Sequence, residues 1–132
     1  MELIIASQNQ NKLVEFKKIL GDKINLFSLC DIGLNQEIPE NEKTIKKNAM
    51  FKAKFVNTQT GKNVFADDTG LEIDSLNGEP GVYSARYSGV DRNSDKNIEL
   101  VLRKLKNKAN RNSRFKTIIS VSYTHLTLPT TT

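Results

Sequence analysis

The opening stretch "MELIIASQNQNKLVEFKKILGDKINLFSL" (1–29) decides the fold class. Its short apolar run at 3–6 is typical of a buried strand, and a second apolar run follows at 24–29. The segment 11–20 between them carries apolar residues at helical spacing: Leu13, Phe16, Ile19 and Leu20. Gly21 then ends the helix. A strand, a helix and a strand within about thirty residues predict an α/β fold.

The remaining segments continue this alternation. A helix is predicted over 44–59, with a buried face formed by Ile45, Ala49, Lys52, Ala53 and Val56. A third strand is predicted at 63–67, followed by a separate extended segment at 71–74. An amphipathic helix on Ile98, Val101, Leu102 and Leu105 and a strand at 114–120 complete the pattern. By its length the chain is one domain or a piece of one, and we expect residues 1–120 to be the N-terminal part of a domain.

Composition restricts the class of protein. The chain has 132 residues, 27% of them charged, and a net charge of +5, which suits a globular protein with anionic partners. We expect no membrane span, because no apolar stretch approaches the roughly 20 residues that a span requires. The single cysteine, Cys30, cannot form an internal disulfide and is predicted to be a packed small hydrophobic residue. These features predict a cytoplasmic protein.

The end of the chain differs in composition from the rest. No charged residue occurs from Thr117 to Thr132. The segment "VSYTHLTLPT" (121–130) resembles the translation of a transposon-end adapter used in sequencing. We therefore expect 121–132 to be a non-native tail without function, His125 included, and the natural sequence to depart near Ser120. A polar C-terminal strand is the alternative.

A polar loop lies between the first predicted strand and the first helix. A helix N-terminus offers unpaired N–H groups and the positive end of the helix dipole, which suit phosphate. The loop contains no glycine, so its side chains would make most of the contacts. Ordinary helix capping by Asn9 or Asn11, with Lys12 in solvent, explains the same residues. The candidate phosphate-binding residues are Ser7, Gln8, Asn9, Gln10, Asn11 and Lys12.

Acidic residues mark a second candidate site. Asp67 and Asp68 directly follow the apolar run 63–66 at the end of the predicted third strand, and Glu40 precedes a helix. Two adjacent carboxylates repel each other, and a divalent cation relieves that repulsion. Mg²⁺ is commonly held by one or two carboxylates together with substrate phosphates. The alternatives are a turn that contains Asp67 and Asp68, and helix capping by Glu40.

Three stretches together resemble a known family. They are "SQNQNK" (7–12), the "NA" and "KA" pairs within 48–53, and above all "ADDTGLEIDSLNGEPGVYSARYSG" (66–89). They resemble the inosine triphosphate pyrophosphatase family over residues 1 to about 120. The resemblance implies an elongated mixed sheet flanked by helices, in a fold related to the Maf proteins. It further implies hydrolysis of ITP, dITP and XTP to the monophosphate and pyrophosphate by a Mg²⁺-dependent homodimer, with Mn²⁺ as a possible substitute. No nucleic-acid or membrane partner is implied.

The resemblance also implies a role for each matched residue. Ser7 to Lys12 would line the triphosphate pocket, with Ser7, Asn9 and Lys12 in direct contact with the substrate. Glu40 and Asp68 would hold the metal, and Asp68 would also act as the base toward the attacking water. Asp67 would support them. Thr69 would contact the substrate.

Two departures from the family pattern qualify these expectations. Lys46 and Lys47 stand where the family usually has acidic residues, and we expect both to face solvent. The family's later Phe-Gly-Tyr-Asp and Ser-His-Arg stretches, which recognise the base, have no counterpart in the sequence. We therefore expect a truncated fragment of low stability and activity. A Maf-like pyrophosphatase and a basic nucleic-acid-binding module, based on the run 103–114, are the alternatives.

Overall fold

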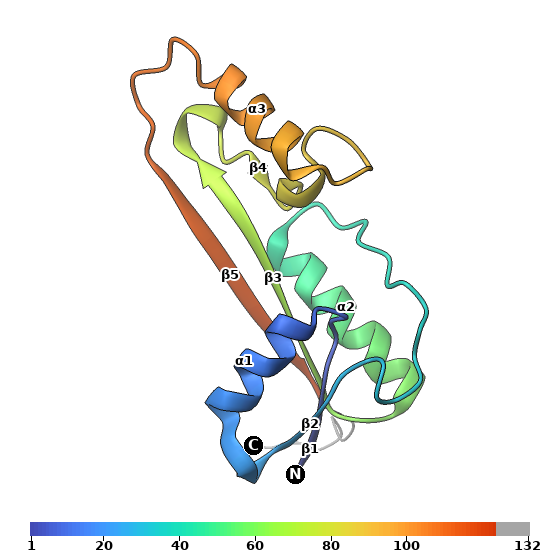
Figure 1. Ribbon diagram of the computed structural model, residues 1–132. Helices are drawn as coiled ribbons and strands as arrows, with labels where there is room; N and C mark the ends of the chain where they lie inside the picture. The colour runs from blue at the N-terminus through green and yellow to red at the C-terminus, as the bar shows by residue number, and fades with distance from the viewer. Residues whose placement is uncertain (124–132) are drawn as a thin grey trace, which may run out of the picture. The chain divides into compact units, whose positions relative to one another are not determined.

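The computed structural model describes residues 1–123, and the chain forms two compact units. The first contains Met1–Asn41, Ala49–Asp67 and the chain from Ile119; the second contains Glu42–Asn48 and Asp68–Ile118. Strand β3 (Val64–Ile73) contributes its first half to one unit and its second half to the other (Figure 1). Most of the predicted tail, including His125, lies outside the described residues.

The first unit is built on three parallel strands. Strand β1 (Glu2–Ile5) lies between β2 (Asn25–Phe27) and the first half of β3, with Ile4 opposite Phe27 and Ile5 opposite Phe65. Helix α1 (Gln10–Leu20) and a short 3₁₀ turn connect β1 to β2. This arrangement confirms the predicted strand–helix–strand unit.

Helices α1 and α2 (Ile45–Thr60) cover opposite faces of these strands. Ala53 and Val56 of α2 pack with Ile4, Ala6, Leu29, Val64 and Ala66. Leu13 of α1 packs with Ile5, Leu26 and Phe65, and the Phe16 ring meets the Phe65 ring edge-on at 5.0 Å. Successive side chains of a strand point to opposite faces, so even-numbered residues in the first half of β3 face α2 and odd-numbered residues there face α1.

The second unit is built on the second half of β3. Strand β4 (Pro80–Gly81) pairs with it antiparallel, with Leu71 opposite Gly81. Strand β5 (Ser113–Ser122) also pairs with β3 (Figure 1). From Asn112 to Arg114 to Thr117, the contacted residues on the β3 side have decreasing residue numbers: Asp74, Glu72 and Thr69. This order is that of antiparallel strands. The other elements are 3₁₀ turns at Asp74–Leu76 and Ser84–Arg86 and helix α3 (Ser94–Lys104).

Gly70 allows β3 to be approached closely from two sides. A Cβ at this position would lie 2.8 Å from Cδ1 of Ile45, in the first turn of α2, and would clash with the carbonyl oxygen of Gly81. The Ser84 hydroxyl donates to that carbonyl at 2.6 Å and accepts from the Leu71 N–H at 2.9 Å. Only glycine fits this junction of two strands and a helix.

The structure corrects the prediction of a strand end at Asp67. Asp67 and Asp68 both lie inside β3, which continues to Ile73. Neither the end of a strand nor a turn occurs at these two residues. The sequence predicted a strand end because Asp, Thr and Gly are common in turns. In the structure, β3 instead continues through these residues, with β1 paired to its start and β4 paired to it beyond Gly70.

Several predicted core residues are exposed. The side chains of Ile19, Ile98 and Leu102 are 75%, 57% and 56% exposed. Cys30 is also exposed, and it begins a turn in which the Gly33 N–H donates to the Cys30 carbonyl. The predicted buried face of α2, by contrast, is confirmed for Ile45, Ala49, Lys52, Ala53 and Val56.

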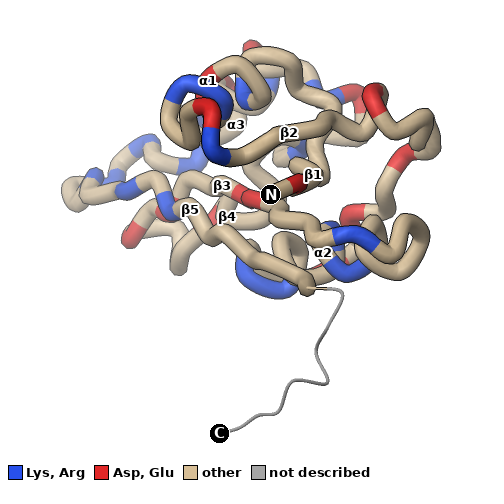
Figure 2. The backbone as a smooth tube through the Cα atoms, turned by 90° about the horizontal axis from the view of Figure 1, so that it is seen from below, with Lys and Arg blue, Asp and Glu red and all other residues tan. Residues whose placement is uncertain are grey.

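Charged side chains are distributed over several elements. Lysines and arginines occur on α1, on α2 and between α3 and β5 (Figure 2). Lys46 and Lys47 are exposed, as predicted. Within residues 1–123, no helix has the length and apolar character needed to cross a membrane.

Candidate active site

The loop between β1 and α1 is held by its own hydrogen bonds. Asn9 caps α1, and its side-chain oxygen accepts from the N–H groups of Asn11 and Lys12 at 3.0 and 3.3 Å. The Ser7 hydroxyl oxygen accepts from the Asn9 N–H at 3.0 Å. The capping role predicted for Asn9 is therefore confirmed, and the N-terminus of α1 is fixed at the carboxyl end of β1.

Lys12 is the charged group of this loop. Its ammonium lies 2.8 Å from Oδ2 of Asp67, and the side chains of the two residues are 34% and 7% exposed. The alternative of a purely solvated Lys12 is therefore wrong. Asp67 fixes this ammonium at the start of a helix, where a phosphate would meet both the lysine and the helix dipole. The other oxygen of Asp67, Oδ1, is buried and has no hydrogen-bond partner among the described residues.

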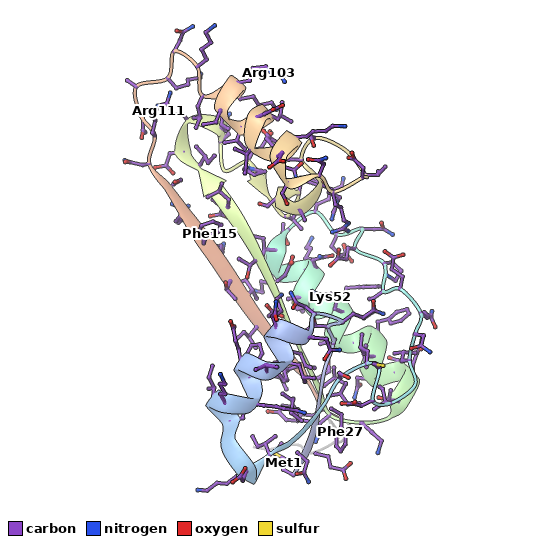
Figure 3. All side chains as sticks on the ribbon, viewed as in Figure 1. Met1, Phe27, Lys52, Arg103, Arg111 and Phe115 are labelled. Carbon is purple, nitrogen blue, oxygen red and sulfur yellow. The ribbon has the colours of Figure 1, made fainter. Side chains whose placement is uncertain are left out.

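A second lysine also contacts Asp67, although the sequence predicted it only as part of a packed helix face. Lys52 of α2 (Figure 3) donates to the backbone carbonyl of Asp67 at 2.6 Å. Its ammonium lies 3.8 Å from the Glu40 carboxylate, and its side chain is only 10% exposed. The position of Lys52 within an otherwise apolar stripe of the helix could have identified it as a site residue. Lysine is almost never fully buried without a partner.

Asp68 contacts the second unit's part of α2. The Asn48 side-chain amide donates to Oδ2 of Asp68 at 3.2 Å, and Asn48 is only 1% exposed. Asn48 was not among the predicted site residues. It lies four residues before Lys52, so both polar side chains lie on the same face of the helix as the apolar stripe.

The two adjacent aspartates thus point to opposite faces of β3. Asp67 pairs with Lys12 of α1, whereas Asp68 pairs with Asn48 of α2. This divergence follows from the alternation of side chains along a strand.

The remaining predicted substrate residue, Thr69, lies in the second unit. Its hydroxyl is 2.8 Å from the hydroxyl of Thr117 on β5, and both residues are exposed. The carboxylates predicted to hold a metal belong to different units, Glu40 to the first and Asp68 to the second. Within residues 1–123, no group of three or more His, Cys, Asp or Glu side chains could hold a metal.

The basic run at 103–114 is partly occupied by internal contacts. The Arg111 guanidinium donates to the Leu105 carbonyl, and Arg114 donates to the Glu72 carboxylate at 3.0 Å. Lys104 donates to the Tyr87 hydroxyl, which itself donates to Glu79. These contacts leave a weaker basic footprint than the sequence alone suggests.

A cavity of about 330 Å³ lies at the opposite, amino end of β1. Met1, Glu2, Ile4, Phe27, Lys62 and Asn63 line it. The polar residues of the candidate site lie beyond the carboxyl end of β1 and within β3, which is the end where α/β sheets usually bind ligands.

Comparison with known proteins identifies the family. The model of the Ham1 family matches residues 3–130. The chain belongs to the Ham1 family. The match bears out the family membership that the sequence resemblance suggested.

Curated relatives support the same assignment. The dITP/XTP pyrophosphatase of Flavobacterium psychrophilum is 48% identical over 122 residues, covering 92% of this chain and 64% of that protein. The protein of the same name from Bacillus subtilis is 46% identical over 124 residues, covering 92% of this chain and 63% of its own length. The chain therefore spans less than two thirds of the length of these Ham1 relatives.

Solved structures confirm the mixed α/β fold with helices flanking a sheet. The Ham1 protein of Staphylococcus aureus superposes with a TM-score of 0.86 at 37% identity, over 93% of this chain and 64% of that one. The nucleoside-triphosphatase or dITP/XTP pyrophosphatase of Mycobacterium abscessus gives a TM-score of 0.84 at 34% identity, over 95% and 67% of the two chains.

Proposed function

We propose that this Ham1 protein hydrolyses non-canonical purine nucleoside triphosphates, namely ITP, dITP and XTP, to the monophosphate and pyrophosphate. The observation that carries the proposal is the 48% identity, over 92% of the chain, to a relative named dITP/XTP pyrophosphatase. Such an enzyme removes these nucleotides from the nucleotide pool.

The loop between β1 and α1 would bind the triphosphate. Its support is the N-terminus of α1, capped by Asn9, with the Lys12 ammonium beside it. Backbone N–H groups and a lysine at a helix start form a favourable site for phosphate oxygens. Asp67 would keep Lys12 in place for this contact, and the exposed Thr69 hydroxyl would add a further contact to the substrate.

Asp68 would accept a proton from the water that attacks the phosphate chain. A base of this kind acts by holding the water in line with the bond that breaks, and positioning of this sort supplies much of the rate in phosphoryl chemistry. One oxygen of this carboxylate accepts a hydrogen bond from the amide of Asn48.

Mg²⁺ is the proposed cofactor, with Mn²⁺ as a substitute, and Glu40 and Asp68 would hold it. Carboxylate oxygens suit a hard cation, and Mg²⁺ commonly takes one or two carboxylates while water and substrate phosphates complete its coordination. When bound, the ion would offset the charge of the phosphates.

The active protein is further proposed to be a cytoplasmic homodimer. The segment "GVYSARYSG" (81–89) would help to shape the pocket and to meet the second subunit. Sedimentation equilibrium tests the dimer directly, and a mass of a single chain at all concentrations would contradict it.

Release of pyrophosphate tests the function. The protein is incubated with ITP, dITP, XTP, ATP or GTP, with Mg²⁺ or with EDTA, and nucleotide binding is measured in parallel by calorimetry. We expect turnover only with Mg²⁺ and a preference for the non-canonical purines. Asp68→Asn should lower turnover by about 100-fold or more, the usual range for a general base.

Glu42→Gln is the matched control for Glu40→Gln, because Glu42 lies two residues away in the same loop. Glu40→Gln should raise the Mg²⁺ concentration needed for half-maximal activity, and Glu42→Gln should not. Equal turnover of all five nucleotides, or full activity in EDTA, would refute the proposal.

A further inference from the structure

Asn48 is a buried polar residue without an assigned role. It is the fourth residue of α2, and its backbone N–H donates to the Thr44 carbonyl at 3.0 Å in the first turn of the helix. The residue is 1% exposed, and its side-chain nitrogen donates to Oδ2 of Asp68 at 3.2 Å. The Asn48 side of this contact is buried, whereas Asp68 is half-buried.

The other end of the same amide is unsatisfied. Oδ1 of Asn48 is buried and has no hydrogen-bond partner among the described residues. Turning the amide over would not help, since the oxygen would then face a carboxylate oxygen of Asp68. A buried polar atom without a partner destabilises a fold, and such atoms in native proteins call for an explanation.

The start of α2 is fixed independently of this contact. Ile45, three residues before Asn48 and on the same helix face, packs against Gly70, where a Cβ would lie 2.8 Å from Cδ1 of Ile45. Gly70 lies two residues after Asp68 on the same face of β3. Ser84 holds the adjoining strands through Leu71 and Gly81. Contacts other than its own hydrogen bond therefore place the Asn48 amide beside Asp68.

We infer that Asn48 is a positioning residue that fixes the rotation of the Asp68 carboxylate. This inference rests on the proposed function, in which Asp68 contacts the metal and the attacking water. The bond from Nδ2 of Asn48 to Oδ2 holds the carboxylate plane of Asp68 in a preferred orientation. The unsatisfied Asn48 oxygen is the cost in stability of placing an amide there instead of an apolar side chain.

Asn48→Leu separates positioning from structure, because leucine has nearly the same size but lacks both polar atoms. We expect an unchanged or raised melting temperature, since the unsatisfied oxygen is removed. The Mn²⁺ affinity, measured by electron paramagnetic resonance without substrate, and kcat should fall about 10- to 100-fold, as is usual when a group that orients a metal ligand is lost. KM for the nucleotide should change little.

Asn57→Leu is the matched control, because Asn57 lies on the same helix and donates to the Lys62 carbonyl. It should leave Mn²⁺ affinity and kcat unchanged. A purely structural Asn48 would instead lower melting temperature and activity together, and that result would overturn the inference. Wild-type Mn²⁺ affinity and kcat in Asn48→Leu would also overturn it.

Asp68→Asn distinguishes a failure of the proposed function from a failure of the inference about Asn48. If Asp68→Asn binds Mn²⁺ and turns over nucleotide as the wild type does, the proposed function of Asp68 fails, and the inference fails with it. If Asp68→Asn is inactive while Asn48→Leu matches the wild type, only the positioning role of Asn48 is refuted.

Discussion

The two units differ in how they are held together. The first has an apolar core on both faces of its strands, centred on side chains such as Ile4, Ile5, Leu29, Val56 and Val64. In the second, the buried apolar side chains among the described residues are those of Ile45, Ile73, Pro80 and Leu105. Val90, Ile98, Leu102 and Phe115 of the second unit are exposed.

Polar contacts take the place of a core in the second unit. The Ser84 hydroxyl joins β3 to β4, Arg114 joins β5 to Glu72, and Lys104 of α3 joins Tyr87. Exposed contacts of this kind contribute about 0–1 kcal/mol each. Lys12 and Asp67 therefore belong to the well-packed first unit. Asp68 and Thr69 belong to the second unit, whose stability depends on a few specific contacts.

A substitution that creates a cavity in the core of the first unit should have the largest effect on stability. Leu29 is 1% exposed within the core on the α2 face. Leu29→Ala should lower the free energy of unfolding by about 2–5 kcal/mol, measured by urea denaturation. A loss below about 1 kcal/mol would show that the first unit is not the better packed of the two.

Overpacking the second unit should come next. Gly70→Ala places a methyl group against Ile45 and the Gly81 carbonyl, so either the strands or the helix must shift. The expected cost is about 1–3 kcal/mol by the same denaturation assay. Gly33→Ala provides a control in open space, although its positive φ of 74° adds a backbone cost of its own. A Gly70→Ala protein as stable as the wild type would show that this junction is loose.

Removal of the Lys12 charge should destabilise the first unit to a smaller extent. Lys12→Met leaves the Asp67 carboxylate buried without its cation. We expect a loss of about 1–2 kcal/mol, less than for a fully buried pair, because a third of the Lys12 side chain is exposed. Lys18→Met, on the exposed side of α1, should have no measurable effect. Equal effects of the two changes would exclude a structural role for the pair.

Alkaline pH should weaken the second unit selectively. Burial raises the pKa of Tyr87 above 10.0, and the hydrogen bond from Lys104 to Tyr87 raises the pKa of Lys104 above 10.5. Both groups hold their protons more tightly when folded, so their contribution is complete below about pH 10 and is lost as the pH rises further. Denaturation between pH 8 and 11 should show this loss in the wild type and less of it in Tyr87→Phe. An identical pH dependence in both proteins would contradict the assignment.

The smallest effect is expected on the exposed face of α3. Leu102→Ser should change stability by about 0.5 kcal/mol or less in thermal melts, because more than half of this side chain is already in solvent. A loss above about 2 kcal/mol would mean that Leu102 is covered, as in a packed interior.

Much of the fold could be predicted because periodicity reports burial directly. Helix α2 was predicted over 44–59 and extends over Ile45–Thr60, since five residues of one face are buried. Exposure of Ile98 and Leu102 could not be predicted, because an amphipathic pattern shows which face is apolar but not whether anything packs on it.

The candidate site was predicted less completely. Helix capping by Asn9 followed from local chemistry alone. The opposite directions of Asp67 and Asp68 required knowledge that β3 continues through them, which depends on pairing with distant β4. Asn48 and Lys52 were missed as site residues because their partners lie twenty and fifteen residues further along the chain.

The exposed thiol of Cys30 has a practical consequence. It is the single cysteine of the sequence, so a maleimide dye or spin label would attach at one defined place in the first unit. The same thiol can cross-link two molecules by air oxidation during storage. Mass measurements made without a reductant would then report a covalent pair, which could be mistaken for a native dimer.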